Sequence, residues 1–230
     1  MATHDSLTKL QADVVRCHVC PRLVEWRERA AREPPRRFAG QTYWARPVPS
    51  FGDPRARVLV VGLAPAANGG NRTGRIFTGD RSGDWLFAAL HRAGFANQPQ
   101  SLHPGDGLRL DGAYVTAVNR CCPPDNRPTP AERDNCLPYL ERELALLSRV
   151  RVVVALGAFA WDGALRAMAG AGHRTPKPRA RFGHRAEAHA GPYLLLGCYH
   201  PSQLNTSTGV LTRPMLDEVM DRARALSERP

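Results

Sequence analysis

The sequence predicts an α/β fold: a three-layer α/β/α sandwich around a short, about four-stranded, parallel sheet. Short apolar runs rich in β-branched residues are typical of buried strands, and four occur, at Val58–Leu63, Tyr114–Asn119, Val152–Leu156 and Tyr193–Tyr199. Helical patterns lie between or after them, at Trp85–Arg92, Pro130–Leu147, Ala158–Met168 and Arg213–Leu226. Because far more than a hairpin loop separates successive strands, parallel βαβ units with helices on both faces are favoured.

The other segments are less regular. The stretch Asp5–Arg32 has a helical pattern that breaks at Cys17–Pro21. Glu33–Phe51 and Gly170–Gly191 are crowded with proline, arginine and other loop-forming residues, and each predicts an irregular loop. A length of 230 residues fits a single domain over residues 1–230.

Composition indicates a globular protein that attracts polyanions. The hydrophobic content of 43% is that of a folded chain, and no segment reaches the roughly 20 apolar residues that a membrane helix needs. The first residues, MATHDSLTKL, lack the pattern of a secretory signal, so we expect a cytoplasmic location. The net charge of +11 favours nucleic acids as partners. Because only Lys9 and Lys177 are lysines, a GC-rich coding bias toward arginine is the alternative explanation.

Four of the six cysteines form two pairs that suit a metal centre. Cys17 and Cys20 form a C-x-x-C pair, and Cys121 and Cys136 flank a proline-rich turn where Thr129–Glu132 predicts a capping box. Disulfides are not expected without an export signal. Four thiolates can hold a zinc ion or a [4Fe–4S] cluster, and spacing alone does not choose. A thioredoxin-like redox pair is disfavoured because no strand precedes Cys17.

The two remaining cysteines have simpler interpretations. Cys122 is a neighbour that could replace Cys121, but on an extended segment its side chain should point the other way. Cys198 lies inside an apolar strand, which predicts a buried, inert thiol.

A glycine-rich run, GLAPAANGGNRTGRIFTGD from Gly62 to Asp80, follows the first strand. Ligands of open parallel sheets bind beyond the carboxyl ends of the strands, so we expect the chemistry here and after the second and last strands. The stretch GGNRTGRI approaches a phosphate-binding P-loop. Arg75 replaces its lysine and Ile76 replaces its magnesium-binding hydroxyl, so nucleotide-dependent chemistry is disfavoured.

Several segments, in the right order from Cys17 to about Met215, resemble the uracil-DNA glycosylase superfamily in its family 5 (type b) form. The glycine-rich run is similar to the first motif, and HPSQLNTSTGVLT from His200 is similar to the last. The C-x-x-C pair and the CPPDNRPTP segment resemble families 4 and 5, which share an iron–sulfur cluster. The resemblance implies an α/β/α sandwich, and a structural [4Fe–4S] cluster on Cys17, Cys20, Cys121 and Cys136.

The resemblance implies a DNA glycosylase that hydrolyses the N-glycosidic bond of uracil, and of other deaminated bases, to start base-excision repair. Such an enzyme must extrude the nucleotide and stabilise both an oxocarbenium-like sugar and a departing uracil anion. By resemblance, Asp80 is the working carboxylate, His200 donates to a uracil carbonyl oxygen, and Asn126 assists catalysis. The structural alternatives are a helix N-cap at Asp80, a satisfied structural histidine at His200 and a turn at Asn126.

The resemblance also implies a base-binding pocket, formed at the first motif by Gly62, Leu63 and Ala64. Many superfamily members have a polar or acidic residue at the position of Ala64. Neither Leu63 nor Ala64 can activate water, although family 5 shows the same kind of apolar residue. Phe77 corresponds to the aromatic that stacks on the flipped base, with a core phenylalanine as the alternative. Ser202 is a possible donor to DNA phosphate.

Base reading is where the chain departs from family 4. The uracil-reading asparagine of that family falls at Ala117 here, and Asn119, two residues on, would project on the same strand face and substitute for it. A less polar pocket predicts looser discrimination, and therefore activity on uracil and on other deaminated or damaged bases.

A noncatalytic DNA-binding or damage-sensing protein with a metal or cluster site is the alternative function, favoured by the apolar Ala64. A zinc-dependent base deaminase is rejected because its H-x-E and P-C-x-x-C elements are missing. We expect a monomer that binds DNA, associates with the nucleoid and has no membrane partner. The arginine-rich loops Arg29–Arg46 and Arg174–Arg185, together with Arg213, are candidate phosphate contacts, and steep salt dependence of binding would distinguish them from solvated side chains.

Overall fold

The computed structural model describes residues 5–228 and contains a six-stranded sheet with strand order β1-β3-β2-β4-β6-β5. Its four central strands are parallel: β3 (Ala113–Ala117), β2 (Val58–Gly62), β4 (Val152–Leu156) and β6 (Tyr193–Cys198). They fall on the four predicted apolar runs, which confirms these strands. Near-continuous apolar runs suit this position because helices cover both faces of a parallel sheet.

Each edge of the sheet carries an antiparallel strand that the sequence prediction missed. β1 (Phe51–Gly52) pairs with β3, and β5 (Glu187–Ala190) pairs with β6. The prediction of irregular loops is therefore wrong at the end of each of those segments. The sequence of β5, EAHA, lacks the β-branched and aromatic residues that indicate a strand, and it is held by its pairing with β6.

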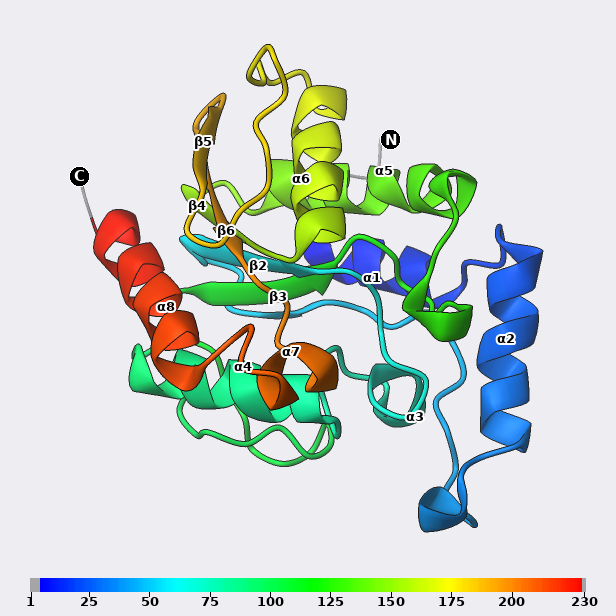
Figure 1. Ribbon diagram of the computed structural model, residues 1–230. Helices are drawn as coiled ribbons and strands as arrows, with labels where there is room; N and C mark the ends of the chain where they lie inside the picture. The colour runs from blue at the N-terminus through cyan, green and yellow to red at the C-terminus, as the bar shows by residue number, and fades with distance from the viewer. Residues whose placement is uncertain (1–4, 229–230) are drawn as a thin grey trace.

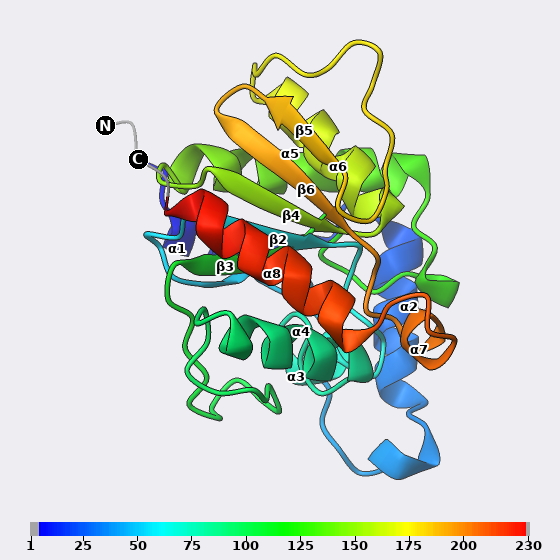
Figure 2. The same ribbon diagram turned by 60° about the vertical axis from the view of Figure 1, so that its left-hand side comes forward.

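Helices cover both faces of the sheet, as Figure 1 and Figure 2 show. On one face lie α1 (Leu7–Val15), α5 (Pro130–Leu146) and α6 (Ala158–Gly170), and on the other lie α4 (Arg81–Arg92) and α8 (Arg213–Ser227). Strand β2 alternates between the two layers: Val58 and Val60 pack with α4 and α8, whereas Leu59 and Val61 pack with α5 and α6. The predicted three-layer sandwich is confirmed.

The other helices lie in the connections, namely α2 (Pro21–Arg32), the short α3 (Gly70–Thr73) and α7 (Gln203–Ser207), and the 3₁₀ turns η1 (Arg36–Phe38) and η2 (Pro124–Asn126). The predicted break between α1 and α2 is present. The predicted capping box is also present at the start of α5, where Glu132 N–H donates to Thr129 Oγ1 at 3.2 Å and Thr129 N–H donates to Glu132 Oε2 at 2.7 Å. Within residues 5–228, no helix combines the length and the apolar character needed to cross a bilayer.

The strand order places a crevice at the carboxyl ends of the central strands. The chain passes from β2 to β3 on one side and later to β4 on the other, so β2 lies at the point where the order reverses. Ligands bind at such switch points in open α/β sheets. The segments that follow β2, β3 and β6 all leave at this end, and they carry the candidate site.

Candidate functional site

An aromatic pair lies at the carboxyl ends of β2 and β6. The rings of Phe77 and His200 have their centroids 6.1 Å apart and are tilted by 33°. Phe77 is buried and adopts a left-handed backbone conformation, with φ of 52°. Its ring lies against Gly62, where an added Cβ would come within 2.5 Å of Phe77 Cζ. The absence of a side chain at Gly62 is therefore what admits the ring beside the end of β2.

His200 is held by its backbone and keeps its ring available. The Asn205 side chain donates to the His200 carbonyl oxygen at 2.9 Å, which fixes the start of the last motif. Within residues 5–228 no hydrogen bond engages the ring nitrogens of His200. Burial lowers the pKa of His200 to about 4, so its imidazole is neutral at neutral pH and offers one N–H and one acceptor.

Asp80 closes the loop that begins at Gly62 and caps α4. Its Oδ1 accepts from Gly83 N–H at 3.0 Å, so the structural role considered for Asp80 is present. Its second oxygen faces the backbone of Gly69, where an added Cβ would come within 1.8 Å of Oδ2. Burial raises the pKa of the Asp80 carboxyl above its usual value.

The capping contact also connects Asp80 to the aromatic pair. An added Cβ on Gly83 would meet the carbonyl oxygen of Phe77 at 1.8 Å, so the first turn of α4 packs directly on the residue that carries the ring. The carboxylate of Asp80, the ring of Phe77 and the imidazole of His200 are thus built around one end of the sheet. This combination offers an apolar stacking face, a neutral N–H donor and a partly desolvated acid.

The remaining pocket residues of the first motif sit beside this group. Leu63 and Ala64 are half-buried and directly follow β2, and the Leu63 carbonyl accepts from Asn119 N–H at 3.0 Å. Ala117 pairs with Gly62 in the register of β3 and β2. The position of the family 4 base reader therefore lies at this edge, with a methyl group where that family has an amide.

Asn119 does not continue the alternation of β3, because the strand ends at Ala117. The expectation that it projects on the face of Ala117 is not met: it lies in a cleft lined by the cysteines, and its Nδ2 donates to the Glu132 carbonyl of α5 at 2.9 Å. Its Oδ1 is buried and has no hydrogen-bond partner among the described residues. A role in reading the base stays a prediction that rests on this free acceptor.

Asn126 and Ser202 occupy turns. Asn126 is exposed in η2, with φ of 55°, and no contact within residues 5–228 connects its side chain with Asp80 or His200. Ser202 caps α7 by accepting from Asn205 N–H at 3.3 Å, which leaves its own hydroxyl proton free to donate.

The four predicted cysteine ligands line a common cleft, with contributions from the α1–α2 break, the end of β3 and helix α5. Hydrogen-bond donors point at three of the sulfur atoms. Arg27 Nη1 donates to Cys121 at 3.2 Å, Arg120 N–H to Cys136 at 3.3 Å, and Asn135 Nδ2 to Cys20 at 3.6 Å. Such donors are what thiolate ligands require around them.

Burial raises the pKa of the thiols, to about 11 at Cys121 and about 12 at Cys136, although Arg27 and Arg120 act in the opposite direction. Within residues 5–228, no three metal-ligating side chains lie close enough together to hold a single ion. Cys198 is buried, as predicted, and Cys122 is buried too.

Sequence reasoning missed two features around the cleft. Arg27 is 1% exposed, and its Nε has no partner among the described residues. Arg120 forms a buried ion pair with Glu143 at 2.6 Å. Nothing in the spacing of either arginine distinguishes it from the many solvated arginines of this chain.

A third missed feature is Leu204, which lies on α7 two residues after Ser202 and is 71% exposed. The sequence did contain a signal for this residue, because Leu204 is a large apolar residue within the otherwise mostly polar last motif.

Comparison with known proteins gives one family. Residues 49–224 match the model of the uracil DNA glycosylase superfamily. Similar proteins named type-5 uracil-DNA glycosylase occur in Mycobacterium tuberculosis (54% identical, 96% of this chain, 82% of the relative) and Thermus thermophilus (51%, 92% and 94%). Another, from Pyrobaculum aerophilum, is 47% identical over 92% of this chain and 89% of its own length. The chain belongs to the uracil-DNA glycosylase superfamily.

Proposed function

We propose that this protein is a uracil-DNA glycosylase that hydrolyses the N-glycosidic bond of uracil in DNA and so starts base-excision repair. The observation that carries the proposal is the pair formed by Phe77 and the neutral His200, packed at the switch point of the sheet beside Asp80. It meets the two needs of base excision, a stacking face for an extruded base and a donor for the leaving group.

The chemistry is divided between two side chains. As the bond between base and sugar breaks, negative charge grows on uracil and the His200 N–H stabilises a carbonyl oxygen. A neutral imidazole suits this task because it donates a hydrogen bond without transferring its proton early. The ionised carboxylate of Asp80 stabilises the positive sugar and orients the attacking water, for which its uncapped oxygen is available.

Other residues bind the substrate. Phe77 stacks on the flipped base, a contact worth about 1–3 kcal/mol. Ser202 donates to a phosphate, and Leu204 enters the space that the extruded nucleotide leaves, since exposed apolar side chains act as wedges between base steps. With a methyl group at Ala117, the pocket accepts other deaminated bases besides uracil.

The cysteine cleft holds a [4Fe–4S] cluster on Cys17, Cys20, Cys121 and Cys136. A zinc ion needs sulfur ligands at about 2.3 Å. The four thiols line one cleft but are not close enough together to bind a single ion. This arrangement fits a [4Fe–4S] cluster better than a zinc ion. The four cysteines would hold the cluster as thiolates, and the cluster would supply a structural link between the α1–α2 break, the end of β3 and helix α5. Brown protein with broad absorption near about 400 nm, lost in Cys136→Ser, supports it.

The deciding experiment uses end-labelled duplex DNA with one uracil. Incubation with the purified, cluster-replete protein followed by alkali should cut the labelled strand at the uracil, and a matched thymine duplex should stay intact. His200→Gln should lower the single-turnover rate on the order of 10²-fold. If the wild-type protein binds the DNA but leaves every deaminated base in place, the noncatalytic damage-sensing alternative is correct.

A further inference from the structure

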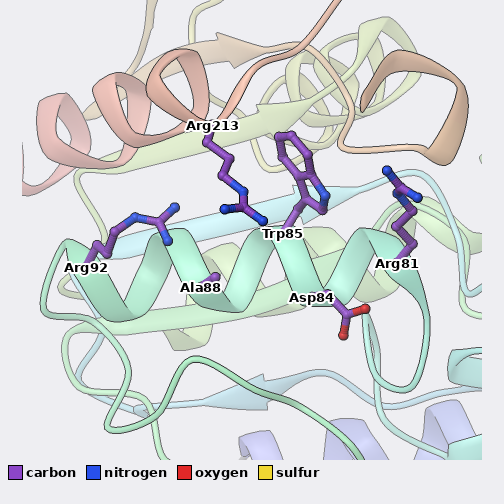
Figure 3. Close-up of a pocket in the computed structure, with 6 residues that line it drawn as sticks. All are labelled: Arg81, Asp84, Trp85, Ala88, Arg92 and Arg213. Atoms are coloured by element: carbon purple, nitrogen blue, oxygen red, sulfur yellow. The ribbon is translucent and has the colours of Figure 1, made fainter. Parts of the chain in front are cut away.

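A surface groove runs between α4 and α8, outside the site described above. It has a volume of about 500 Å³ and is lined by Arg81, Asp84, Trp85, Ala88, Arg92 and Arg213. Figure 3 shows Trp85 standing between Arg213 and Arg81, with the small side chain of Ala88 between Trp85 and Arg92. The groove is therefore hollowed at Ala88 and walled by an aromatic ring and cationic side chains.

The arginines of the groove differ in their partners. Arg92 is neutralised by a bidentate ion pair with Asp217. Arg81 and Arg213 form no ion pair within residues 5–228, and the Arg213 guanidinium lies 5.7 Å from the centroid of the Trp85 ring. Asp84 points away from these groups in Figure 3. Two cations that have no ion pair among the described residues thus flank an aromatic ring, a combination that suits the phosphates and bases of a single strand.

The groove begins one residue along the chain from the candidate catalytic carboxylate. Arg81 directly follows Asp80, so the two side chains leave the same turn of α4. The positions of Arg81, Trp85, Ala88 and Arg92 repeat at helical spacing, which makes one stripe about 16 Å long at 1.5 Å per residue. The other wall starts at Arg213, the first residue of α8.

We infer that this groove binds the DNA strand that flanks the extruded nucleotide, with phosphates on Arg81 and Arg213 and an unpaired base or sugar against Trp85. The inference rests on the proposed function, because it extends the DNA surface from the base pocket along α4. The groove contributes to the affinity for DNA and takes no part in bond cleavage.

Binding of undamaged single-stranded DNA tests the groove without any chemistry. Anisotropy titrations with a labelled oligothymidine should show that Trp85→Ala weakens binding at least about fivefold, as for one lost stacking contact. Arg81→Gln with Arg213→Gln should reduce the slope of log K against log salt by about 1.4, since each phosphate contact contributes about 0.7. Arg222→Gln is the matched control, because Arg222 lies on α8 but pairs with Glu187.

Two variants at Ala88 test the groove in case Trp85→Ala does not fold. Ala88→Glu fills the hollow with a negative charge, and Ala88→Gln fills it with the same volume and no charge. Ala88→Glu should weaken binding more than Ala88→Gln, with Tm values that agree. Wild-type affinity and salt slope in the Trp85, double-arginine and Ala88→Glu variants would overturn the groove, even if uracil is excised. The expected binding losses in a protein that excises nothing would leave the groove standing and remove the proposed function.

Discussion

At the scale of single residues, Asp80 combines two tasks on its two carboxyl oxygens. One oxygen caps α4 through Gly83, and the other faces Gly69 in the loop after β2. A purely structural cap would be served equally well by asparagine, since both residues rank at the top of N-cap preference. The two tasks can therefore be separated by substitution.

Asp80→Asn should keep the fold and lose the chemistry. The cap is retained, so we expect the free energy of unfolding to change by less than about 1 kcal/mol. The charge that stabilises the sugar is removed, so the single-turnover rate of uracil excision should fall by about 10²-fold or more. Rapid-quench kinetics and thermal melting measure the two effects. Asp111→Asn, which removes an exposed acid just before the start of β3, should leave the rate unchanged. An unchanged rate in Asp80→Asn would exclude the carboxylate from the mechanism.

The rate of excision should depend on pH through the same carboxyl. Burial raises the pKa of Asp80, and the proposed mechanism needs its ionised form, so the rate should rise with pH through a pKa above the usual value of 3.8. His200, with a pKa near 4, remains neutral over most of this range. A single-turnover pH profile measures the acid limb. This acid limb should be missing from the pH profile of Asp80→Asn. If it persists in that variant, it reports the titration of another group.

Gly62→Ala tests the contact between β2 and the stacking ring. An added methyl group would lie 2.5 Å from Phe77 Cζ, so the ring must shift, and its arrangement with His200 changes. We expect KM for uracil-containing DNA to rise and the rate to fall, while the sheet remains intact because Gly62 is the last residue of β2. Steady-state kinetics and circular dichroism check this. Gly172→Ala is not a suitable control because of its positive φ, whereas Gly105→Ala meets only the ring of His103 and should be silent.

At the scale of elements, a buried polar network joins the end of β3 to α5. Glu143 of α5 accepts from Arg120 Nη2 at 2.6 Å and from Thr116 Oγ1 at 2.7 Å, and Ser50 hydrogen-bonds to both Arg120 and Glu143. Arg120 precedes Cys121, and its backbone N–H reaches Cys136. The network therefore sets the spacing between two of the proposed cluster ligands.

Glu143→Gln should destabilise the protein strongly, because it leaves the Arg120 charge buried without a counter-charge. We expect a loss of about 3–5 kcal/mol in the free energy of unfolding, measured from denaturant midpoints, with faster loss of cluster absorbance. Glu187→Gln, which breaks the exposed pair with Arg222, should cost less than about 1 kcal/mol. Equal effects of the two substitutions would contradict the assigned role of the network.

At the scale of the whole molecule, groups with shifted pKa values make stability depend on pH. His200 has a folded pKa of about 4 against an unfolded value near 6.5, so the unfolded chain takes up its proton first. This contribution to stability is complete above pH 6.5 and is lost as pH falls toward 4. The Arg75 guanidinium and backbone N–H groups outweigh burial and lower the pKa of Asp106, so its contribution is lost below about pH 3.8.

The melting temperature should therefore be level above about pH 6.5 and should fall in two stages below it. His200→Gln should reduce the first stage, between about pH 6.5 and 4, and keep the second. The part of the first stage that remains belongs to His184, whose pKa burial also lowers. The raised pKa of Asp80 has the opposite effect on stability, because the folded state takes up that proton first. It therefore offsets part of the stability that is lost in the first stage. Calorimetry across this range measures the stages, and a first stage of unchanged size in His200→Gln would contradict the lowered pKa of His200.

The sequence by itself determined the four parallel strands, the main helices, the capping box at Thr129 and the family. These follow from local signals: apolar runs such as Val152–Leu156, helical periodicity, and motifs whose residues are neighbours in the chain. Through the resemblance it also assigned Gly62, Phe77 and His200 to one site, but it did not predict the contacts between them.

Only the tertiary structure decided what depends on contacts distant in sequence. β5 exists because β6 pairs with it, Asn119 turns to α5 because β3 ends two residues earlier, and Arg27 approaches Cys121 across 94 positions of the chain. The same is true of the charge. The sequence does not separate paired from unpaired arginines. Packing pairs Arg92 with Asp217 and leaves Arg81 and Arg213 without an ion pair among the described residues, because an ion pair is set by distance in space and not by position in the chain.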